Sequence, residues 1–214
     1  MQELTIPTFQ KLWRIQRPGN LEELWDTLGD DDFGDDERLP YWVEVWPASL
    51  ALGEWLTSQQ LLIAGEPCLD IGCGLGFTGL VAAELGAHVV AMDYEPEALR
   101  YAHLNAFLNE VVTEPLWVVA DWRYPAFQKE AFSFMWAGDI MYEQRFIQPV
   151  TECILHCLKP GGCMWVSEPS RAVYKDFLMH STTNGLQCRK VHTVNTTAFE
   201  GHDVPVNIWE IRKS

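Results

Sequence analysis

The sequence predicts an α/β fold built on a mostly parallel sheet, with an antiparallel pair of strands at its C-terminal edge. Three observations lead to this prediction. A short apolar run from Cys68 ends in an acidic residue, Asp70, and a glycine-rich turn follows that opens a helical pattern. Apolar runs and helical patterns then alternate as far as residue 167, and two stretches at 187–196 and 204–212 alternate apolar and polar residues. At 214 residues, the chain is long enough for one such domain.

Each element has its own sequence signal. The helix after the glycine turn is expected to end at Gly86, because glycine is favoured just past a helix C-terminus. The next helix is expected from 95 to 109, since Pro96 and two glutamates occupy its first turn. Strands are expected at 87–92, 116–120, 132–137 and 163–167, a helix at 146–158, and a turn at 159–162.

Each of the first four predicted strands ends in an aspartate. These residues are Asp70, Asp93, Asp121 and Asp139. In an open α/β sheet the carboxyl ends of the parallel strands share one edge, and ligands bind outside that edge. We therefore expect the four carboxylates to surround a ligand site.

The turn at residues 70–79, Asp-Ile-Gly-Cys-Gly-Leu-Gly-Phe-Thr-Gly, indicates which kind of ligand binds. Its glycines allow backbone N–H groups to approach a ligand with no side chain between them. The turn also matches the dinucleotide fingerprint, with Asp93 where a ribose-binding acid would lie. However, Asp70 would repel a pyrophosphate and attract the cationic sulfonium and ammonium of S-adenosylmethionine. The residues favour S-adenosylmethionine, and a nicotinamide-dependent oxidoreductase remains the alternative.

Composition limits the possible partners. Thirty acidic and fifteen basic residues give a formal charge of −15, which disfavours nucleic acid and suits a cationic cofactor or a basic substrate. Part of the excess lies in the acidic block 30–37, which is expected to be a solvated loop. We expect no membrane segment and no signal peptide, and six reduced cysteines in a cytoplasmic protein. The cluster Cys153-x-x-His156-Cys157 is expected to be helix packing, and no metal site is predicted.

The glycine turn resembles the first motif of class I S-adenosylmethionine-dependent methyltransferases. The resemblance implies a Rossmann-like, seven-stranded sheet with helices on both faces. Residues 40–47, Pro-Tyr-Trp-Val-Glu-Val-Trp-Pro, with a helix following from Ala48, resemble the family-16 protein lysine methyltransferases. Residues 138–143, Gly-Asp-Ile-Met-Tyr-Glu, match the Asp-x-x-Tyr signature of that family. Within it, the likeness is to the branch that includes the electron-transfer flavoprotein β-subunit lysine methyltransferase, and it covers residues 38–170.

The resemblance implies a set of site residues. Asp139 and Tyr142 are expected to be catalytic, by aligning the acceptor amine. The expected cofactor-binding residues are Trp46, Asp70, Gly72, Cys73, Gly74, Gly76, Asp93, Tyr94, Asp121, Trp122 and Gly138. Structural alternatives remain open for several: helix caps at Asp93 and Asp139, a turn former at Asp121, and ordinary packing at Trp46 and Trp122.

For domain organisation, we expect an N-terminal extension with an acidic loop at 1–39 and a methyltransferase domain at 40–214. The leading hypothesis for function is N-methylation of a protein lysine. Methylation of a small amine or other metabolite by the same fold is a second hypothesis, and a catalytically silent S-adenosylmethionine-binding module is a third. The sequence does not identify the acceptor or the oligomeric state, and residues 167–171, Ser-Glu-Pro-Ser-Arg, match no motif that we can assign.

Overall fold

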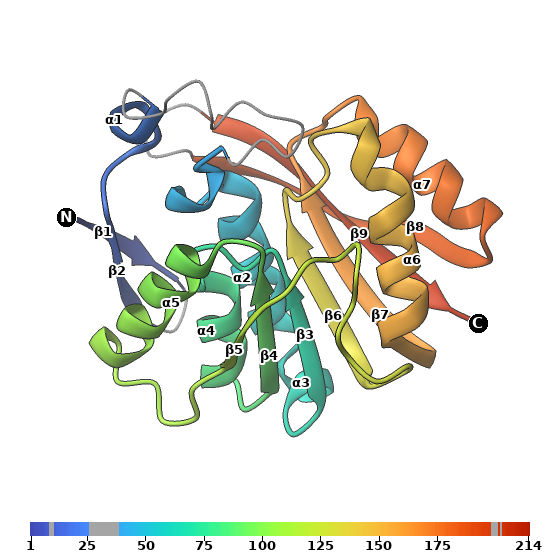
Figure 1. The fold of residues 1–214 in the computed structure, drawn as a ribbon, viewed down its shortest axis with the longest axis horizontal. Coiled ribbons are helices and arrows are strands. Elements are labelled where there is room, and N and C mark those ends of the chain that lie inside the picture. Colours follow the sequence, from blue (N-terminus) through green and yellow to red (C-terminus); the bar gives the residue numbers. More distant parts are fainter. Residues whose placement is uncertain (9–10, 26–38, 198–200, 202) are drawn as a thin grey trace.

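The structure is a computed structural model, and it describes residues 1–8, 11–25, 39–197, 201 and 203–214. At its centre is a seven-stranded sheet in the order β5-β4-β3-β6-β7-β9-β8 (Figure 1). The strands are β3 Pro67–Ile71, β4 His88–Asp93, β5 Leu116–Val119, β6 Phe132–Gly138, β7 Leu158–Glu168, β8 Leu186–Thr197 and β9 Asp203–Lys213. Strands β3 to β7 pair in parallel, whereas β9 runs antiparallel to both β7 and β8. The predicted fold class is confirmed.

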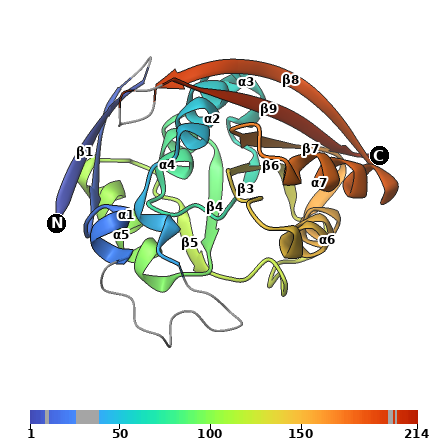
Figure 2. The same cartoon turned by 90° about the horizontal axis from the view of Figure 1, so that it is seen from above.

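Helices cover both faces of this sheet (Figure 2). They are α2 Pro47–Ser58, α3 Gln60–Ile63, α4 Phe77–Glu84, α5 Pro96–Leu108, α6 Ile147–Cys157 and α7 Val173–Thr183, with 3-10 helices η2 Tyr41–Val43 and η3 Gln144–Phe146. Buried side chains of α2, α4 and α5 form one core against the sheet, and those of α6 and α7 form a second core against the opposite face. The helices predicted at 95–109 and 146–158 are confirmed within one or two residues at each end.

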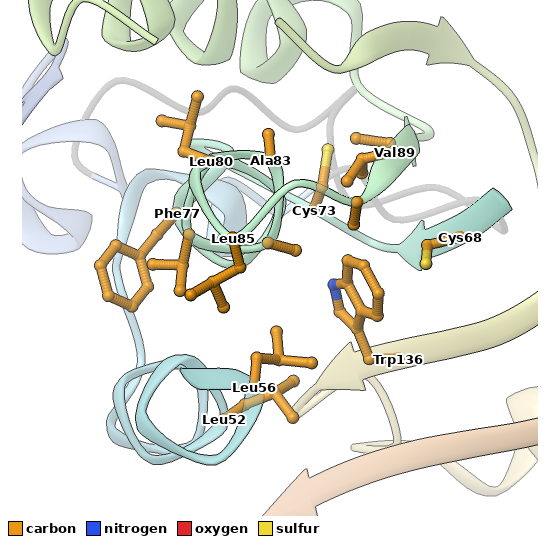
Figure 3. Close-up of a cluster of buried hydrophobic side chains, with 14 of the residues drawn as sticks. Leu52, Leu56, Cys68, Cys73, Phe77, Leu80, Ala83, Leu85, Val89 and Trp136 are labelled. Atoms are coloured by element: carbon orange, nitrogen blue, oxygen red, sulfur yellow. The ribbon is translucent and has the colours of Figure 1, made fainter. Parts of the chain in front are cut away.

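Alternation along the strands explains why there are two cores. Cys68 belongs to the first core and its neighbour Leu69 to the second, because successive residues of a strand point to opposite faces. In the first core, Leu52 of α2 packs in one cluster with Phe77 of α4 and Trp136 of β6 (Figure 3). This cluster fixes α2 and α4 beside the carboxyl ends of the central strands.

The prediction of a turn at 159–162 is wrong. Strand β7 begins at Leu158, and its pairing with β6 shifts register between Phe132 and Phe134. Gly161 lies at the irregularity with a φ of +74°, a conformation that glycine adopts without strain. The Pro-Gly-Gly sequence therefore produces a bulge inside a continuous strand, since extra residues can be accommodated without ending the ladder.

The N-terminal region contains a hairpin that the sequence analysis did not identify. Strands β1 Gln2–Pro7 and β2 Leu12–Arg17 form a separate antiparallel sheet, followed by α1 Leu21–Trp25. Trp13 and Ile15 of β2 are buried in the first core, and the Asn105 and Asn109 side chains of α5 bond to the β2 backbone. The hairpin thus shares a core with the rest of the chain. The acidic block 30–37 lies outside the described residues, and a domain boundary at residue 39 stays a prediction.

Two further features bear on the expected location of the protein. All six cysteines lie in the described part of the chain and are free thiols, and all but Cys188 are buried. Within the residues that the structure describes, no helix is both long and apolar enough to cross a membrane.

Candidate active site

The parallel strands bring acidic side chains to one edge of the sheet. Asp70 lies in β3 one residue before its end, Asp93 closes β4, and Asp139 directly follows β6. Asp121 lies two residues beyond the end of β5. The structure adds one acid that the sequence analysis did not select, Glu168, which closes β7. The predicted grouping of carboxylates at the strand ends is present.

The glycine turn packs tightly against its neighbours. Gly76 precedes α4 with a φ of +86°, and a Cβ there would lie 2.8 Å from both Ala102 and the Trp117 ring. At Gly74 a Cβ would lie 3.2 Å from the backbone oxygen of Trp42. These two glycines thus let α5, β5 and η2 pack closely against the turn. Packing alone therefore requires glycine at both positions, and their contact with a cofactor stays a prediction.

Asp70 lies beneath the first turn of α4. Only 1% of the residue is exposed, and Thr78 Oγ1 donates a hydrogen bond of 2.7 Å to Asp70 Oδ2. Burial raises the pKa of Asp70 to about 7, against the opposing effect of the hydrogen bond from Thr78. The carboxylate therefore ties the strand to the helix, and whether it also attracts a cationic ligand remains a prediction.

Asp93 connects β4 to the glycine turn. Its Oδ2 accepts a 2.8 Å hydrogen bond from Gly74 N, and its Oδ1 accepts a 3.0 Å bond from Glu95 N. The N-terminal cap position of α5 is Glu95, so Asp93 lies two residues before the cap and bonds to its N–H. Burial raises the pKa of Asp93 above its ordinary value.

The residues after β5 form a compact group. Asp121 accepts a 2.8 Å bond from Arg123 N and a 2.7 Å bond from Arg123 Nε, and the Arg123 guanidinium lies over the Tyr94 ring at 5.7 Å. This is the turn-forming arrangement that the sequence left open for Asp121. Trp122 packs edge-on against Phe146 at 5.3 Å, and a Cβ at Gly72 would lie 3.7 Å from the Trp122 ring.

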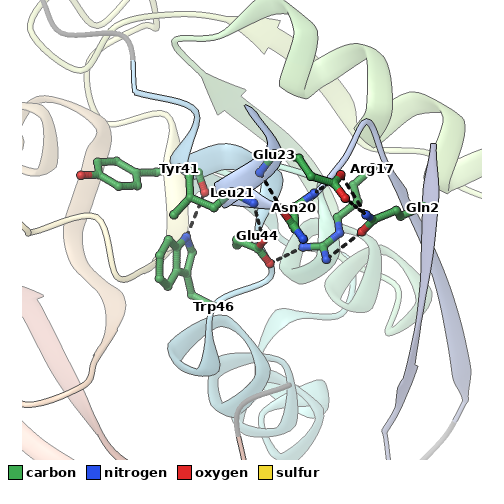
Figure 4. A network of polar contacts seen from close by, with 8 residues as sticks. All are labelled: Gln2, Arg17, Asn20, Leu21, Glu23, Tyr41, Glu44 and Trp46. Atoms are coloured by element: carbon green, nitrogen blue, oxygen red, sulfur yellow. Dashed lines mark hydrogen bonds and ion pairs between the residues drawn. The ribbon is translucent and has the colours of Figure 1, made fainter. Parts of the chain in front are cut away.

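Residues 40–47 are fixed by the N-terminal region (Figure 4). Glu44 forms an ion pair with Arg17 and accepts a 2.9 Å bond from Leu21 N. The indole nitrogen of Trp46 donates a 3.0 Å bond to the Tyr41 carbonyl, and the two rings meet edge-on at 6.2 Å. The position of Trp46 is therefore determined by local packing as well as by any ligand.

A small cavity opens between the start of α2 and the glycine turn. Its lining residues are Glu44, Val45, Ser49, Gly72, Cys73, Leu75, Phe77, Thr78 and Gly138. Gly138 is required there, since a Cβ would lie 2.6 Å from Ser49 Oγ. Among these described lining residues there is a carboxylate and two hydroxyls but no lysine or arginine. The carboxylate, Glu44, is already paired with Arg17, and the cavity measures only about 20 Å³, so its lining fits S-adenosylmethionine only in offering a diphosphate no cationic side chain.

Asp139 and Tyr142 lie at the next strand end. Asp139 has a φ of +54°, and both of its oxygens accept hydrogen bonds from the Arg171 guanidinium. Burial raises the pKa of Asp139, and Arg171 opposes that rise. The Tyr142 ring lies between Tyr41, at 5.3 Å, and Phe146, at 5.1 Å, and burial raises the pKa of its hydroxyl. Neither following helix, η3 or α6, has a side-chain cap in the described residues, so the capping alternative for Asp139 is not observed.

Sequence reasoning missed several residues around these side chains. They are Tyr41, Glu44, Ser49, Thr78, Glu168 and Arg171. Glu168 ends a predicted strand and could have been selected by the same rule as the four aspartates. Arg171 could not, because its contact with Asp139 joins two loops 32 residues apart.

Comparison with known proteins shows which proteins this chain is similar to. Residues 68–162 match a family described as a methyltransferase domain. Together with the seven-stranded sheet and its glycine turn, this match makes the chain similar to the class I S-adenosylmethionine-dependent methyltransferases and supports the cofactor that the sequence favoured.

Individual relatives refine the comparison. The electron transfer flavoprotein beta subunit lysine methyltransferase of Danio rerio is 30% identical over 64% of this chain and 53% of its own length. A ubiquinone biosynthesis O-methyltransferase of Xylella fastidiosa is 28% identical over 54% of this chain and 47% of its own. The chain thus spans about half the length of these curated relatives. A TehB-like methyltransferase structure from Corynebacterium glutamicum shares the fold, with a TM-score of 0.59, 19% identity, and coverage of 80% of this chain and 89% of that one.

Proposed function

We propose that this protein is a cytoplasmic S-adenosylmethionine-dependent methyltransferase that N-methylates a lysine side chain of another protein. The observation that carries the proposal is the Asp-x-x-Tyr arrangement of Asp139 and Tyr142, which begins directly after Gly138, a lining residue of the small cavity. The similarity to a relative named as a lysine methyltransferase supports it. Six free thiols support a reducing, cytoplasmic location.

The proposed cofactor site combines backbone and side-chain groups. The backbones of Gly72, Cys73 and Gly138 line the cavity, and the turn through Gly74 and Gly76 holds it in shape. Each oxygen of Asp93 accepts one backbone hydrogen bond and retains a second acceptor site, which suits two ribose hydroxyls. We assign Trp122 to one side of the adenine. The remaining proposed contacts are Trp46, Asp70, Tyr94 and Asp121.

The proposed reaction is an in-line displacement. S-adenosylmethionine, when bound, supplies a methyl group activated by its sulfonium sulfur. The lysine ammonium would first lose a proton to water, and the lone pair of the neutral amine would then form the N–C bond as the C–S bond breaks, with the electrons of that bond leaving on the sulfur of the demethylated cofactor. Asp139 would orient the amine by accepting its N–H hydrogen bonds, and Tyr142 with its aromatic neighbours would wall the approach and exclude water. Such positioning accounts for most of the catalysis that this chemistry requires.

A small-molecule acceptor is the second candidate. The similarity to an O-methyltransferase of ubiquinone biosynthesis favours it, and the aromatic side chains around Tyr142 would also suit a small organic cation. A binding module without catalysis is the third candidate, and the presence of both Asp139 and Tyr142 argues against it.

Two measurements test the proposal. Calorimetry should detect binding of S-adenosylmethionine or its demethylated product but not of NAD, and NAD binding alone would refute the proposed cofactor. Incubation with methyl-labelled S-adenosylmethionine and a host lysate should then place the label in protein, on lysine. Label only in the small-molecule fraction would select the second candidate, and S-adenosylmethionine binding without transfer would select the third.

Substitution of Asp139 separates catalysis from binding. Asp139→Asn should leave the affinity for S-adenosylmethionine within a few-fold of wild type and lower single-turnover methylation by ~10²-fold, because the acceptor loses its alignment. Tyr142→Phe should reduce the rate more mildly, since the ring remains. Glu210→Gln is a matched control, because Glu210 also holds an arginine, Arg212, through two hydrogen bonds on β9. If Asp139→Asn and the control Glu210→Gln both lose stability and neither loses methylation rate, the catalytic assignment of Asp139 is wrong.

A further inference from the structure

The segment at residues 167–171 has an ordered structure, although its sequence matched no motif. Glu168 Oε1 accepts hydrogen bonds from Asn207 Nδ2 at 2.8 Å and from the Trp209 indole at 3.2 Å. Its Oε2 accepts a 2.9 Å bond from Arg171 N. Ser170, with a φ of +60°, accepts a further bond from Asn207. Strand β9 thus fixes the loop that carries Arg171.

The loop delivers the Arg171 side chain to Asp139. Arg171 Nε lies 2.6 Å from Asp139 Oδ1, and Nη2 lies 2.7 Å from Oδ2, which is a two-point contact between guanidinium and carboxylate. The Asp139 side chain is only 3% exposed, whereas that of Arg171 is 37% exposed. The guanidinium therefore covers the carboxylate, and no amine can reach Asp139 while Arg171 remains in place.

The surroundings of this ion pair suit an organic cation. The Tyr41 and Tyr142 rings contact each other at 5.3 Å, and Phe146 continues the aromatic wall. Arg171 also lines a cavity of about 570 Å³ between α7 and the last strands. Its lining residues include Glu168, Arg171, Lys175, Met179 and Trp209. This cavity gives a displaced Arg171 side chain room to move while Glu168 remains nearby as a partner.

We infer that the Arg171 guanidinium occupies, on Asp139, the position of the acceptor's cationic nitrogen, and that the acceptor enters by displacing it. That the displacing molecule is the methyl acceptor rests on the proposed function. The presence of a cation-binding position on Asp139 does not depend on methyl transfer. Displacement has a consequence for specificity. A neutral molecule would leave Asp139 buried without a cation, whereas an ammonium replaces the lost charge. Arg171 therefore selects for cationic acceptors, and it is a positioning residue rather than a catalytic one.

Removal of Arg171 should open the position to a small cation. We expect Arg171→Ala to bind n-butylammonium, a lysine side-chain analogue, at least ~10-fold more tightly than wild type, since the probe no longer competes with a guanidinium. The measurement is calorimetry together with the rise in melting temperature on adding the probe. Neutral n-butanol should have no such effect. The control is Arg171→Ala combined with Asp139→Asn, which removes the carboxylate and should lose the gain.

The result that overturns the inference is equal n-butylammonium binding by wild type, Arg171→Ala and the double variant. If Arg171→Ala does not fold, Arg171→Lys decides, because an ammonium replaces the two-point contact with a weaker one. Tighter probe binding than in wild type supports the inference, and equal binding contradicts it.

Calorimetry with S-adenosylmethionine on the same preparations tests the proposed function separately. Cofactor binding with no gain in n-butylammonium affinity refutes only this inference. A gain in n-butylammonium affinity without S-adenosylmethionine binding refutes only the proposed function.

Discussion

Buried carboxylates at the glycine turn combine a structural role with a proposed binding role. Asp93 accepts one backbone N–H from the turn and one from the start of α5, so it joins three elements before any ligand binds. Asp70 does the same for β3 and α4 through Thr78. Burial raises the pKa of both aspartates, which means that folding opposes their negative charge. A cationic ligand nearby would offset part of that cost.

Asp93→Ala should weaken cofactor binding by about 10–100-fold, because losing an acceptor for two hydroxyls costs roughly 1.5–3 kcal/mol. It should also lower the free energy of unfolding by about 1–3 kcal/mol, since the N–H groups of Gly74 and Glu95 lose their acceptor. Calorimetry and urea unfolding measure the two effects. A folded variant with an unchanged dissociation constant would remove Asp93 from the cofactor site.

Asp70 should make stability depend on pH. Its pKa is about 7 in the folded protein, against ~3.9 in an unfolded chain, so the folded state keeps a proton that the unfolded state has lost. Stability should therefore fall as pH rises from about 4 to about 7, by up to ~1.4 kcal/mol per pH unit from this group. In Asp70→Asn, the free energy of unfolding should lose this part of its decrease between pH 4 and pH 7. Urea unfolding at pH 5 and pH 7 tests this, and equal slopes in the two proteins would contradict the assignment.

At the scale of elements, the turn between β3 and α4 is limited by packing as well as by backbone conformation. Gly76 and Gly185 have similar φ values, +86° and +89°, but only Gly76 has close neighbours, the Ala102 and Trp117 side chains. The two positions therefore allow the cost of a left-handed conformation to be separated from the cost of steric overlap.

Gly185→Ala should cost about 1–2 kcal/mol, which is the penalty of the left-handed conformation alone. Gly76→Ala should cost ~1–3 kcal/mol more, because its Cβ would lie 2.8 Å from the Ala102 Cβ and the Trp117 ring. The difference in urea midpoint between the two variants measures the packing contribution. Equal losses would show that α5 and β5 can move away from the turn.

The same elements show what local sequence can and cannot predict. The central strands and α5 were predictable, because apolar runs, Pro96 and Gly86 act over a few residues. Pro-Gly-Gly at 160–162 predicts a turn, whereas the structure has a bulge at Gly161, because the local chemistry of the two is the same. Contact of Arg171 with Asp139 depends on how β6 and β7 lie side by side, which no local pattern encodes. The aromatic contacts of Tyr142 likewise depend on tertiary structure.

For the molecule as a whole, the formal charge of −15 should influence which acceptors reach the site. A protein with this excess of acidic residues attracts basic partners over distances comparable to the Debye length, and salt shortens that length. Electrostatic attraction of this kind changes the association rate more than the chemical step. It therefore distinguishes a basic protein or peptide acceptor from a neutral metabolite.

With a lysine-rich peptide as acceptor, kcat/KM should fall as ionic strength rises from roughly 0.01 to 0.15 M, where the Debye length shortens from ~30 to ~8 Å. The fall should be several-fold, because attraction between the acidic enzyme and the basic peptide is screened, while kcat at saturating peptide should change little. The value of kcat at saturating peptide and cofactor, measured at the same salt concentrations, is the control for general salt effects. A lysine-rich peptide whose kcat/KM is independent of salt would contradict the steering of a basic acceptor by the net charge of the enzyme.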